Sequence, residues 1–491
     1  MNKIIMYMLC FTIYTVVFLF WGKNGFKKTN NARDFCVAGN SLGLFTGVFT
    51  FTATWFSAVS MQSVTGSVYA YGYSTILYSV VGWLLGASCL VFIAYRIKEY
   101  NIVTIPEYFK IRYNSKGYQA FTGFIIVICY ILYIIIQIKG FGIVVSTLLD
   151  IDYNVAILLI YLFVVYTSFG GLFSVSKTDT LNFILLAAGI FLAAIFIAND
   201  VGGITVMHEK AAAIMSRASA KYNITQGALL DPSANNLFSP LMIITTGLAW
   251  GLGTAANPQY IIRITATKDR KTGIQMVCLS AIILGVLYLG LMIIGIGSRV
   301  LAPEIGSINS VDEALPYIIN SKMALNLSAL VFISIIAAAI STANSELLIL
   351  ASSFSYDIYT NLFKKQISDE RFLGISRIII FVAGTISLLL SIKPPEILLI
   401  YGSYVWSIFA VSFLFPLYGG LYWKKATKEG AIISSIGGIL TICIFYILEV
   451  TGIHSMILHP VFPGLVIAFV LFYVVSKTTY RRIGDNHEIG Y

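Results

Sequence analysis

Long apolar runs separated by short polar segments dominate the chain. Most of the runs extend for roughly 20 residues, which is the length that an α-helix needs to cross a bilayer. The pattern predicts thirteen spans, at 4–21, 43–72, 75–94, 121–149, 154–173, 180–199, 239–262, 273–296, 327–353, 372–392, 396–419, 430–449 and 461–476. The runs are too long for barrel strands, and a helix satisfies its own backbone hydrogen bonds in lipid. We therefore expect an all-α polytopic membrane protein.

Composition supports a single transmembrane domain over residues 1–491. The chain is 58% hydrophobic and only 11% charged, whereas soluble domains carry about 25% charged residues. A soluble protein this apolar could not cover its own surface, so lipid must be its main solvent. The first run, 4–21, lacks a small-residue cleavage site and is predicted to be a retained span rather than a signal peptide.

The net charge of +10 sets the predicted orientation. The basic residues fall in short clusters between the apolar runs, and one alternate set of loops holds far more Lys and Arg than the other. The positive-inside rule then places the N-terminus outside and the tail 477–491 in the cytoplasm, in a cell membrane. No basic helix or aromatic-basic strand pattern points to nucleic acid.

Cysteine and histidine suggest no metal chemistry. The six cysteines are far apart in sequence and mostly inside apolar runs, so we expect small core residues rather than disulfides or metal ligands. The four histidines fall in loops or the tail, without metal-ligand spacing.

Hydroxyl residues and glycines interrupt the second predicted span. Its centre, "TATWFSAVS" (52–60), carries small oxygen-bearing side chains and no charge. One interpretation is a broken helix whose freed carbonyls and hydroxyls bind a monovalent cation such as Na⁺. The other is close helix packing through small residues, which is common in membranes.

The ninth span favours the cation interpretation. In "AAAISTANSELL" (337–348), Ala338, Ser341 and Thr342 stand at i, i+3 and i+4, and therefore on one helix face. Ser345 continues that face by another turn. The stretch 245–259 combines glycines with a proline, as expected for a second discontinuous helix.

Several motifs together carry a family resemblance: "RDFCVAGNSLG" (33–43), "TIPEYFKIRY" (104–113), "YTSFGGLFSVSKTDTLN" (166–182), "NPQYIIRITATKD" (257–269) and "YGGLYWKKATKEGA" (418–431). With them the chain resembles the sodium/solute symporters, which have the LeuT-type inverted-repeat fold. The resemblance implies two five-helix repeats, 43–199 and 239–419, with discontinuous first helices and with 4–21 and 430–476 peripheral. "SIKPPEILLIYGS" (391–403) and "HPVFPGLV" (459–466) look most similar to the pantothenate branch.

The resemblance also implies a sodium site. Its ligands would be the backbone carbonyls of Ala53, Phe56 and Ala338 and the hydroxyls of Ser341 and Thr342.

Asp179 is a further candidate from the same resemblance. It would serve sodium exit, or a second sodium site with Ser341 and Ser345, although Asn344 departs from the serines found in some members. The alternative is a carboxylate at a helix N-terminus, favoured by the helix dipole.

Candidate solute-binding residues are less specific. Lys139 is a charge inside a span and therefore a functional hypothesis by default; it would pair with a solute carboxylate, or extend its amine to the interface. Proline-transporting members carry an aspartate where this chain has Trp55, which favours an organic anion over proline. The candidates are Trp55, Gln62, Gln137, Lys139, Trp250, Asn257 and Tyr404, with ordinary packing as the alternative for each.

These features predict a Na⁺-coupled importer that works by alternating access, with Na⁺ as the coupling ion. Its partners are a small solute and membrane lipid, with neither nucleic acid nor an obligate protein partner. A proton-coupled carrier, using Lys139 or Glu346, and a transporter-derived solute sensor are the alternatives. An enzyme is not expected, because the sequence shows no nucleophile–base pair.

Overall fold

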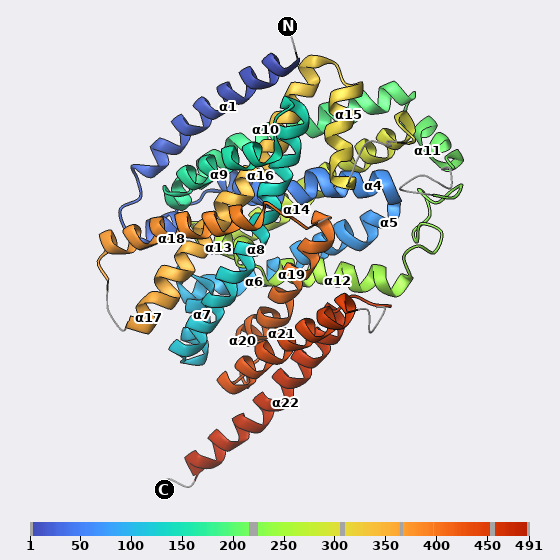
Figure 1. Ribbon diagram of the computed structural model, residues 1–491. Coiled ribbons are helices and arrows are strands. Elements are labelled where there is room, and N and C mark those ends of the chain that lie inside the picture. The colour runs from blue at the N-terminus through green and yellow to red at the C-terminus, as the bar shows by residue number, and fades with distance from the viewer. Residues whose placement is uncertain are drawn as a thin grey trace.

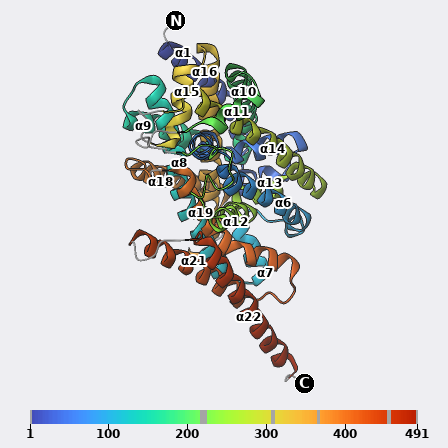
Figure 2. The same cartoon turned by 90° about the vertical axis from the view of Figure 1, so that its right-hand side faces the viewer.

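The protein is described here by a computed structural model that covers residues 3–215, 224–304, 310–363, 367–395, 397–451 and 457–488. Within these ranges the chain is a helical bundle (Figures 1 and 2). The β structure of the described residues is limited to an isolated bridge between Leu42 and Thr267. The predicted all-α fold is confirmed.

Among the described residues, ten helical segments are long and apolar enough to cross a membrane, and a bent pair raises the number to eleven. The ten are Lys3–Lys23, Tyr73–Tyr100, Lys116–Leu149, Gly171–Val201, Arg270–Leu301, Leu325–Leu362, Asp369–Leu390, Leu398–Tyr422, Lys428–Glu449 and Val461–Tyr480. The predicted total of thirteen is not confirmed. Two predicted spans form shorter helices, namely α9 (Tyr153–Ser168) and the successive helices α12 (Pro240–Ala256) and α13 (Pro258–Ala266).

The bent pair is the interrupted second span. Helix α3 (Leu44–Trp55) ends where Phe56 turns to an extended conformation, and the chain resumes as a π-helical turn, η2 (Val59–Val64), followed by α4 (Thr65–Tyr71). The two halves are bent by 60°. The Ser57 hydroxyl accepts from the Val59 N–H at 3.1 Å, and Gln137 Oε1 accepts from the Ala58 N–H at 3.0 Å. Such partners let a helix break inside a membrane protein.

The second break separates α12 from α13. Asn257 is extended, and its side chain accepts from the Gln259 N–H, while Pro258 occupies the first helical position. Upstream, α12 packs closely on α6 (Val81–Arg96): a Cβ added to Gly251 would lie 2.6 Å from the carbonyl oxygen of Gly82. Glycine is required there because the two backbones approach each other directly.

Helix α16 (Leu325–Ser352) lies at the centre of the bundle and contacts α3, α8 (Lys116–Leu149), α9, α10 (Gly171–Val201) and α18 (Asp369–Leu390). Its residues from Val331 to Ser352 are all buried. At the edges, α1 (Lys3–Phe26) covers α10 and α16, while α21 (Lys428–Val450) and α22 (Val461–Glu488) pair side by side (Figures 1 and 2). The division into two repeats stays a prediction.

The motif 104–113 forms α7 (Ile105–Tyr113), whose aromatic side chains Tyr108 and Phe109 are buried against the protein. The expectation that the cysteines are core residues is corrected in part. Of the six free cysteines, Cys36 and Cys129 are buried but Cys278 and Cys443 are exposed. An apolar residue on a membrane helix can face lipid as readily as the core, so hydropathy could not separate these cases.

Candidate functional site

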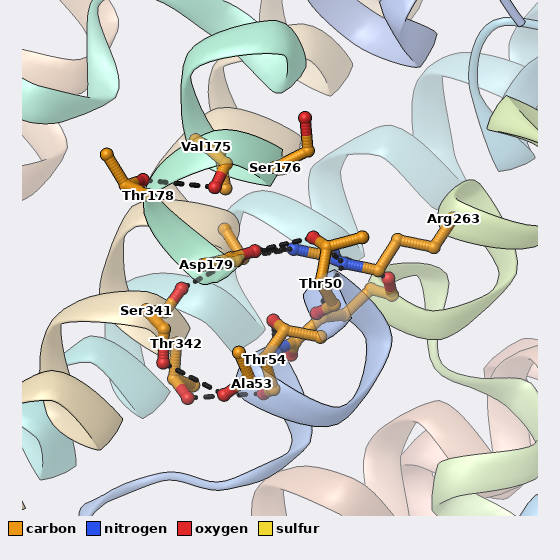
Figure 3. Close-up of polar contacts among 12 residues, drawn as sticks. Thr50, Ala53, Thr54, Val175, Ser176, Thr178, Asp179, Arg263, Ser341 and Thr342 are labelled. Atoms are coloured by element: carbon orange, nitrogen blue, oxygen red, sulfur yellow. Dashed lines mark hydrogen bonds and ion pairs between the residues drawn. The ribbon is translucent and has the colours of Figure 1, made fainter. Parts of the chain in front are cut away.

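The predicted sodium ligands meet where α16 crosses the end of α3. The Ser341 hydroxyl lies 2.8 Å from the carbonyl oxygen of Ala53 and 2.9 Å from that of Ala338. The Thr342 hydroxyl lies 3.0 Å from the carbonyl oxygen of Phe56 and 3.1 Å from that of Thr54. Figure 3 shows both side chains directed at the end of the broken helix.

The structure thus brings the five predicted oxygens together and adds a sixth, that of Thr54. All come from neutral, hard groups, and the carbonyls of Ala53, Thr54 and Phe56 are freed because α3 ends there. Hydroxyl protons that now point at carbonyls can rotate away, leaving oxygen lone pairs for a cation. Half-helix C-terminal carbonyls combined with hydroxyls suit Na⁺ in transporters of discontinuous helices.

Next to this cluster lies a buried ion pair. Asp179 Oδ2 accepts from Arg263 Nη2 at 3.1 Å and from the Thr50 hydroxyl at 2.6 Å, and both charged side chains are fully buried (Figure 3). Asp179 lies well inside α10, which begins at Gly171. The helix-terminus alternative therefore fails, because the dipole effect is confined to the first turn.

The role of Arg263 was not predicted from the sequence. Its Nη2 also donates to the Ser345 hydroxyl at 2.6 Å, and its Nε donates to Thr50. The sequence did indicate a role for it, because a lone arginine in the apolar stretch after Pro258 needs a partner. The guanidinium stands between Asp179 and Ser345, the two residues predicted to hold a second Na⁺.

Lys139 has a protein partner that the sequence did not reveal. Its Nζ lies 3.2 Å from Asp312 Oδ2 and donates to the carbonyl oxygen of Pro395 at 2.7 Å. Asp312 belongs to a segment between predicted spans, too far in sequence for any pattern to pair the two. The lysine is 5% exposed and so does not extend to the interface.

Four of the other solute candidates carry buried polar atoms without a hydrogen-bond partner. These atoms are Gln62 Oε1, Gln137 Nε2, Trp250 Nε1 and Asn257 Nδ2. The rest of each amide is fixed: Gln62 Nε2 donates to the Gly140 carbonyl at 2.7 Å, and Asn257 Oδ1 accepts from the Tyr130 hydroxyl at 2.7 Å. Buried polar groups normally find partners, and water or a polar solute would complete the hydrogen bonding of these atoms.

Trp55 and Tyr404 lie in different surroundings. The Trp55 ring packs on Tyr260 of α13, with ring centroids 4.4 Å apart. Tyr404 donates to Glu449 and lines, together with Trp250 and His459, a separate cavity of about 220 Å³. Burial lowers the pKa of His459 to about 3.

Comparisons with known proteins identify the family of the chain. Residues 35–438 match the sequence model of the sodium:solute symporter family. The osmoregulated proline transporter OpuE of Bacillus subtilis (strain 168) is 28% identical, covering 97% of this chain and 96% of its own length. A sodium/proline symporter of Staphylococcus aureus (strain USA300) is 26% identical, covering 95% and 91% respectively.

Among solved structures, a Na⁺-coupled sialic acid symporter in a substrate-bound, outward-open state superposes with a TM-score of 0.79. It is 21% identical, and the match covers 97% of each chain. MhsT in complex with L-phenylalanine gives a TM-score of 0.53 at 14% identity, over 88% of this chain and 98% of its own. These likenesses concern the fold. The chain belongs to the sodium:solute symporter family, and it is a multi-pass membrane transporter that couples Na⁺ to the movement of a solute, not an enzyme.

Proposed function

We propose that the chain imports a small solute together with one Na⁺ held by Ala53, Phe56, Ala338, Ser341 and Thr342. The observation that carries this proposal is the pair of α16 hydroxyls at 2.8 and 3.0 Å from carbonyls of the broken helix. A cation there would tie α16 to α3. It would therefore bias the relative position of two elements that must move against each other in alternating access.

A single Na⁺ is proposed because Arg263 occupies the second candidate position. Its guanidinium already neutralises Asp179 and donates to Ser345. A second Na⁺ at these two residues would face that positive charge at close range in a poorly screened interior. We propose that Asp179 and Arg263 form an ion pair that has a structural role and that gates the exit route from the sodium site.

The solute is proposed to carry an ammonium group, not only a carboxylate. The prediction of an organic anion depended on Lys139, but Lys139 is paired with Asp312. The relatives compared above include proline transporters by name, and Trp55 alone does not outweigh that likeness. A compact amino acid or similar zwitterion fits both considerations, and nearness to the pantothenate branch stays a prediction.

The energetics are sufficient for accumulation. One Na⁺ charge moving inward contributes about 2.3 kcal/mol per 100 mV, and each tenfold Na⁺ gradient contributes about 1.4 kcal/mol. We propose the cell membrane as the location, with the N-terminus outside and the C-terminus in the cytoplasm.

Uptake into proteoliposomes tests the proposal. With an inward Na⁺ gradient, we expect accumulation of a radiolabelled amino acid that disappears when choline replaces Na⁺ outside. Equal accumulation driven by a proton gradient without Na⁺ would establish the proton carrier instead. Na⁺-independent binding without flux would establish the sensor.

A pair of variants locates the ion. Thr342→Ala should raise the Na⁺ concentration for half-maximal uptake, whereas Ser328→Ala, on the same helix but far from α3, should not. The Ser328 hydroxyl bonds to the carbonyl of Leu325 in its own helix, so its removal is a matched control. An unchanged Na⁺ requirement in Thr342→Ala would remove this site.

A further inference from the structure

Glu346 is a buried carboxylate that the proposed Na⁺ site does not use. It lies on α16 one turn after Thr342, it is fully buried, and neither of its carboxylate oxygens has a hydrogen-bond partner. Among the described residues, the other fully buried carboxylates each have partners: Asp179 has Arg263, Asp312 has Lys139, and Asp357 has Thr104 and Gln119. Glu346 is the exception.

Three tyrosines on neighbouring helices interact electrostatically with Glu346: Tyr130 and Tyr133 on α8 and Tyr260 on α13. No ion pair of the described residues includes Glu346. Arg263, also on α13, is paired with Asp179 and donates to Ser345. An ionised carboxylate buried without a counter-charge is strongly unfavourable, so a positive group supplied by a ligand would relieve it.

Hydrogen bonds join this region to the proposed solute site. The Tyr130 hydroxyl donates to Asn257 and accepts from the Gln259 N–H at 3.0 Å. The Gln259 side chain in turn donates to the Thr54 carbonyl, which Thr342 also contacts. Gln259 Oε1 has no hydrogen-bond partner. Tyr130, which interacts electrostatically with Glu346, thus belongs to this polar patch, and Glu346 itself lies one helical turn from Thr342.

We propose that Glu346 binds the ammonium group of the transported solute. The inference rests on the proposed function, since it assigns one end of the solute to a residue at that site. A buried carboxylate without a counter-charge, with tyrosine side chains in its vicinity, suits an organic ammonium group. A second Na⁺ is less suited, because it needs a shell of several oxygens rather than tyrosine rings.

The rest of the solute then has complementary groups. Gln137 Nε2 and Asn257 Nδ2 are unpartnered donors near the two helix breaks, and the N-terminal end of α13 begins at Pro258. Half-helix N-termini favour anionic solute groups in transporters of this architecture. A zwitterion would thus place its carboxylate toward α13 and its ammonium toward Glu346.

The test uses the purified full chain and a probe panel rather than an assumed solute. Thermal stabilisation is measured in Na⁺ with L-amino acids, with the simple amines pyrrolidine and ethanolamine, and with carboxylates that lack an amine, such as cyclopentanecarboxylate. We expect stabilising probes to carry an ammonium group. The inference is overturned if the strongest probes lack one, or if no ammonium compound stabilises the protein.

Variants locate the effect. Glu346→Gln should weaken the best probe at least tenfold, while Glu346→Asp should retain the preference for ammonium with reduced affinity. Glu429→Gln, which neutralises an exposed carboxylate at the start of α21, should change nothing. An affinity within twofold of wild type in Glu346→Gln overturns the inference.

Stabilisation by Na⁺ alone separates this failure from failure of the proposed function. If Glu346→Gln keeps the Na⁺ response and keeps probe affinity, only the role of Glu346 is wrong. If wild type shows no Na⁺ response, the sodium site itself is wrong. If Glu346→Gln does not fold, Glu346→Asp provides the test of the inference. If Glu346→Asp still responds to Na⁺ but no longer prefers ammonium compounds, the inference is overturned.

Discussion

Asp179 and Glu346 are two fully buried carboxylates on adjacent helices, and the protein treats them in opposite ways. Asp179 meets a guanidinium and a hydroxyl, all within the chain. Glu346 has no hydrogen-bond donor, although it interacts electrostatically with nearby tyrosines. A buried charge costs several kcal/mol unless it is paired. For Asp179 a partner within the chain offsets that cost, whereas for Glu346 a cationic ligand is needed to offset it.

The largest effect is expected from removing the partner of Asp179, so that Asp179 becomes an unpaired buried carboxylate like Glu346. Arg263→Gln leaves Asp179 buried without its counter-charge. Loss of one partner of a buried pair costs about 3–5 kcal/mol, so we expect a pronounced drop in the melting temperature in detergent, with little correctly folded protein at 37 °C.

The control removes both charges together. Arg263→Gln combined with Asp179→Asn should recover much of the lost stability, because no uncompensated charge remains. If the single and double variants melt at the same temperature, the pair contributes through shape and not through charge.

The converse prediction concerns Glu346. Glu346→Met replaces an unpartnered polar group with an apolar side chain of similar volume. Leaving such a group unsatisfied costs about 1–3 kcal/mol, so this variant should melt at a higher temperature than wild type without solute, and should lose solute-dependent stabilisation. A lower melting temperature would mean that Glu346 has a stabilising partner within the protein.

How much of this could be anticipated from sequence differs between the two carboxylates. Helix identity, the break near residue 56 and the face shared by Ser341 and Thr342 follow from local periodicity, which a single sequence records directly. The pairing of Asp179 with Arg263, 84 positions apart, depends on how α10 and α13 meet. Lys139 shows the same limit, because its partner Asp312 comes from a distant connecting segment.

Glu346 was visible in sequence only as an acidic residue in an apolar span. Its importance comes from its lack of partners: no pattern within "AAAISTANSELL" could tell that, among the described residues, no base would pair with it and no donor would bond to it. Hydropathy likewise does not settle the number of spans, because it cannot separate one continuous helix from two short ones such as α12 and α13.

The sodium cluster offers a third, neutral case beside the two carboxylates. Ser341→Ala removes a hydroxyl that lies 2.8 Å from the Ala53 carbonyl and should raise the Na⁺ concentration for half-maximal uptake about tenfold, equivalent to about 1.4 kcal/mol. Folding should be nearly unchanged, since the lost group is uncharged. Uptake measured over a Na⁺ series gives the shift. A change in maximal rate alone, with the Na⁺ dependence unaltered, would place Ser341 outside the ion's reach.

The smallest effect is expected from His459, a buried titratable side chain whose ring nitrogens both have partners. Its Nδ1 accepts from the Val461 N–H at 3.2 Å, so the proton sits on Nε2 and is donated to the Ser403 hydroxyl at 3.1 Å. Burial lowers its pKa from 6.5 to about 3. The folded state thus binds fewer protons than the unfolded one, and stability is lost as pH falls from about 6.5 toward 3.

His459→Gln should flatten the decline of melting temperature between pH 7 and pH 4.5, while Na⁺-driven uptake between pH 6 and pH 8 keeps the pH profile of wild type. A changed uptake profile would mean that His459 exchanges protons during transport. A buried titratable group with a full set of hydrogen-bond partners, a state that Asp179 approaches, would then still take part in function.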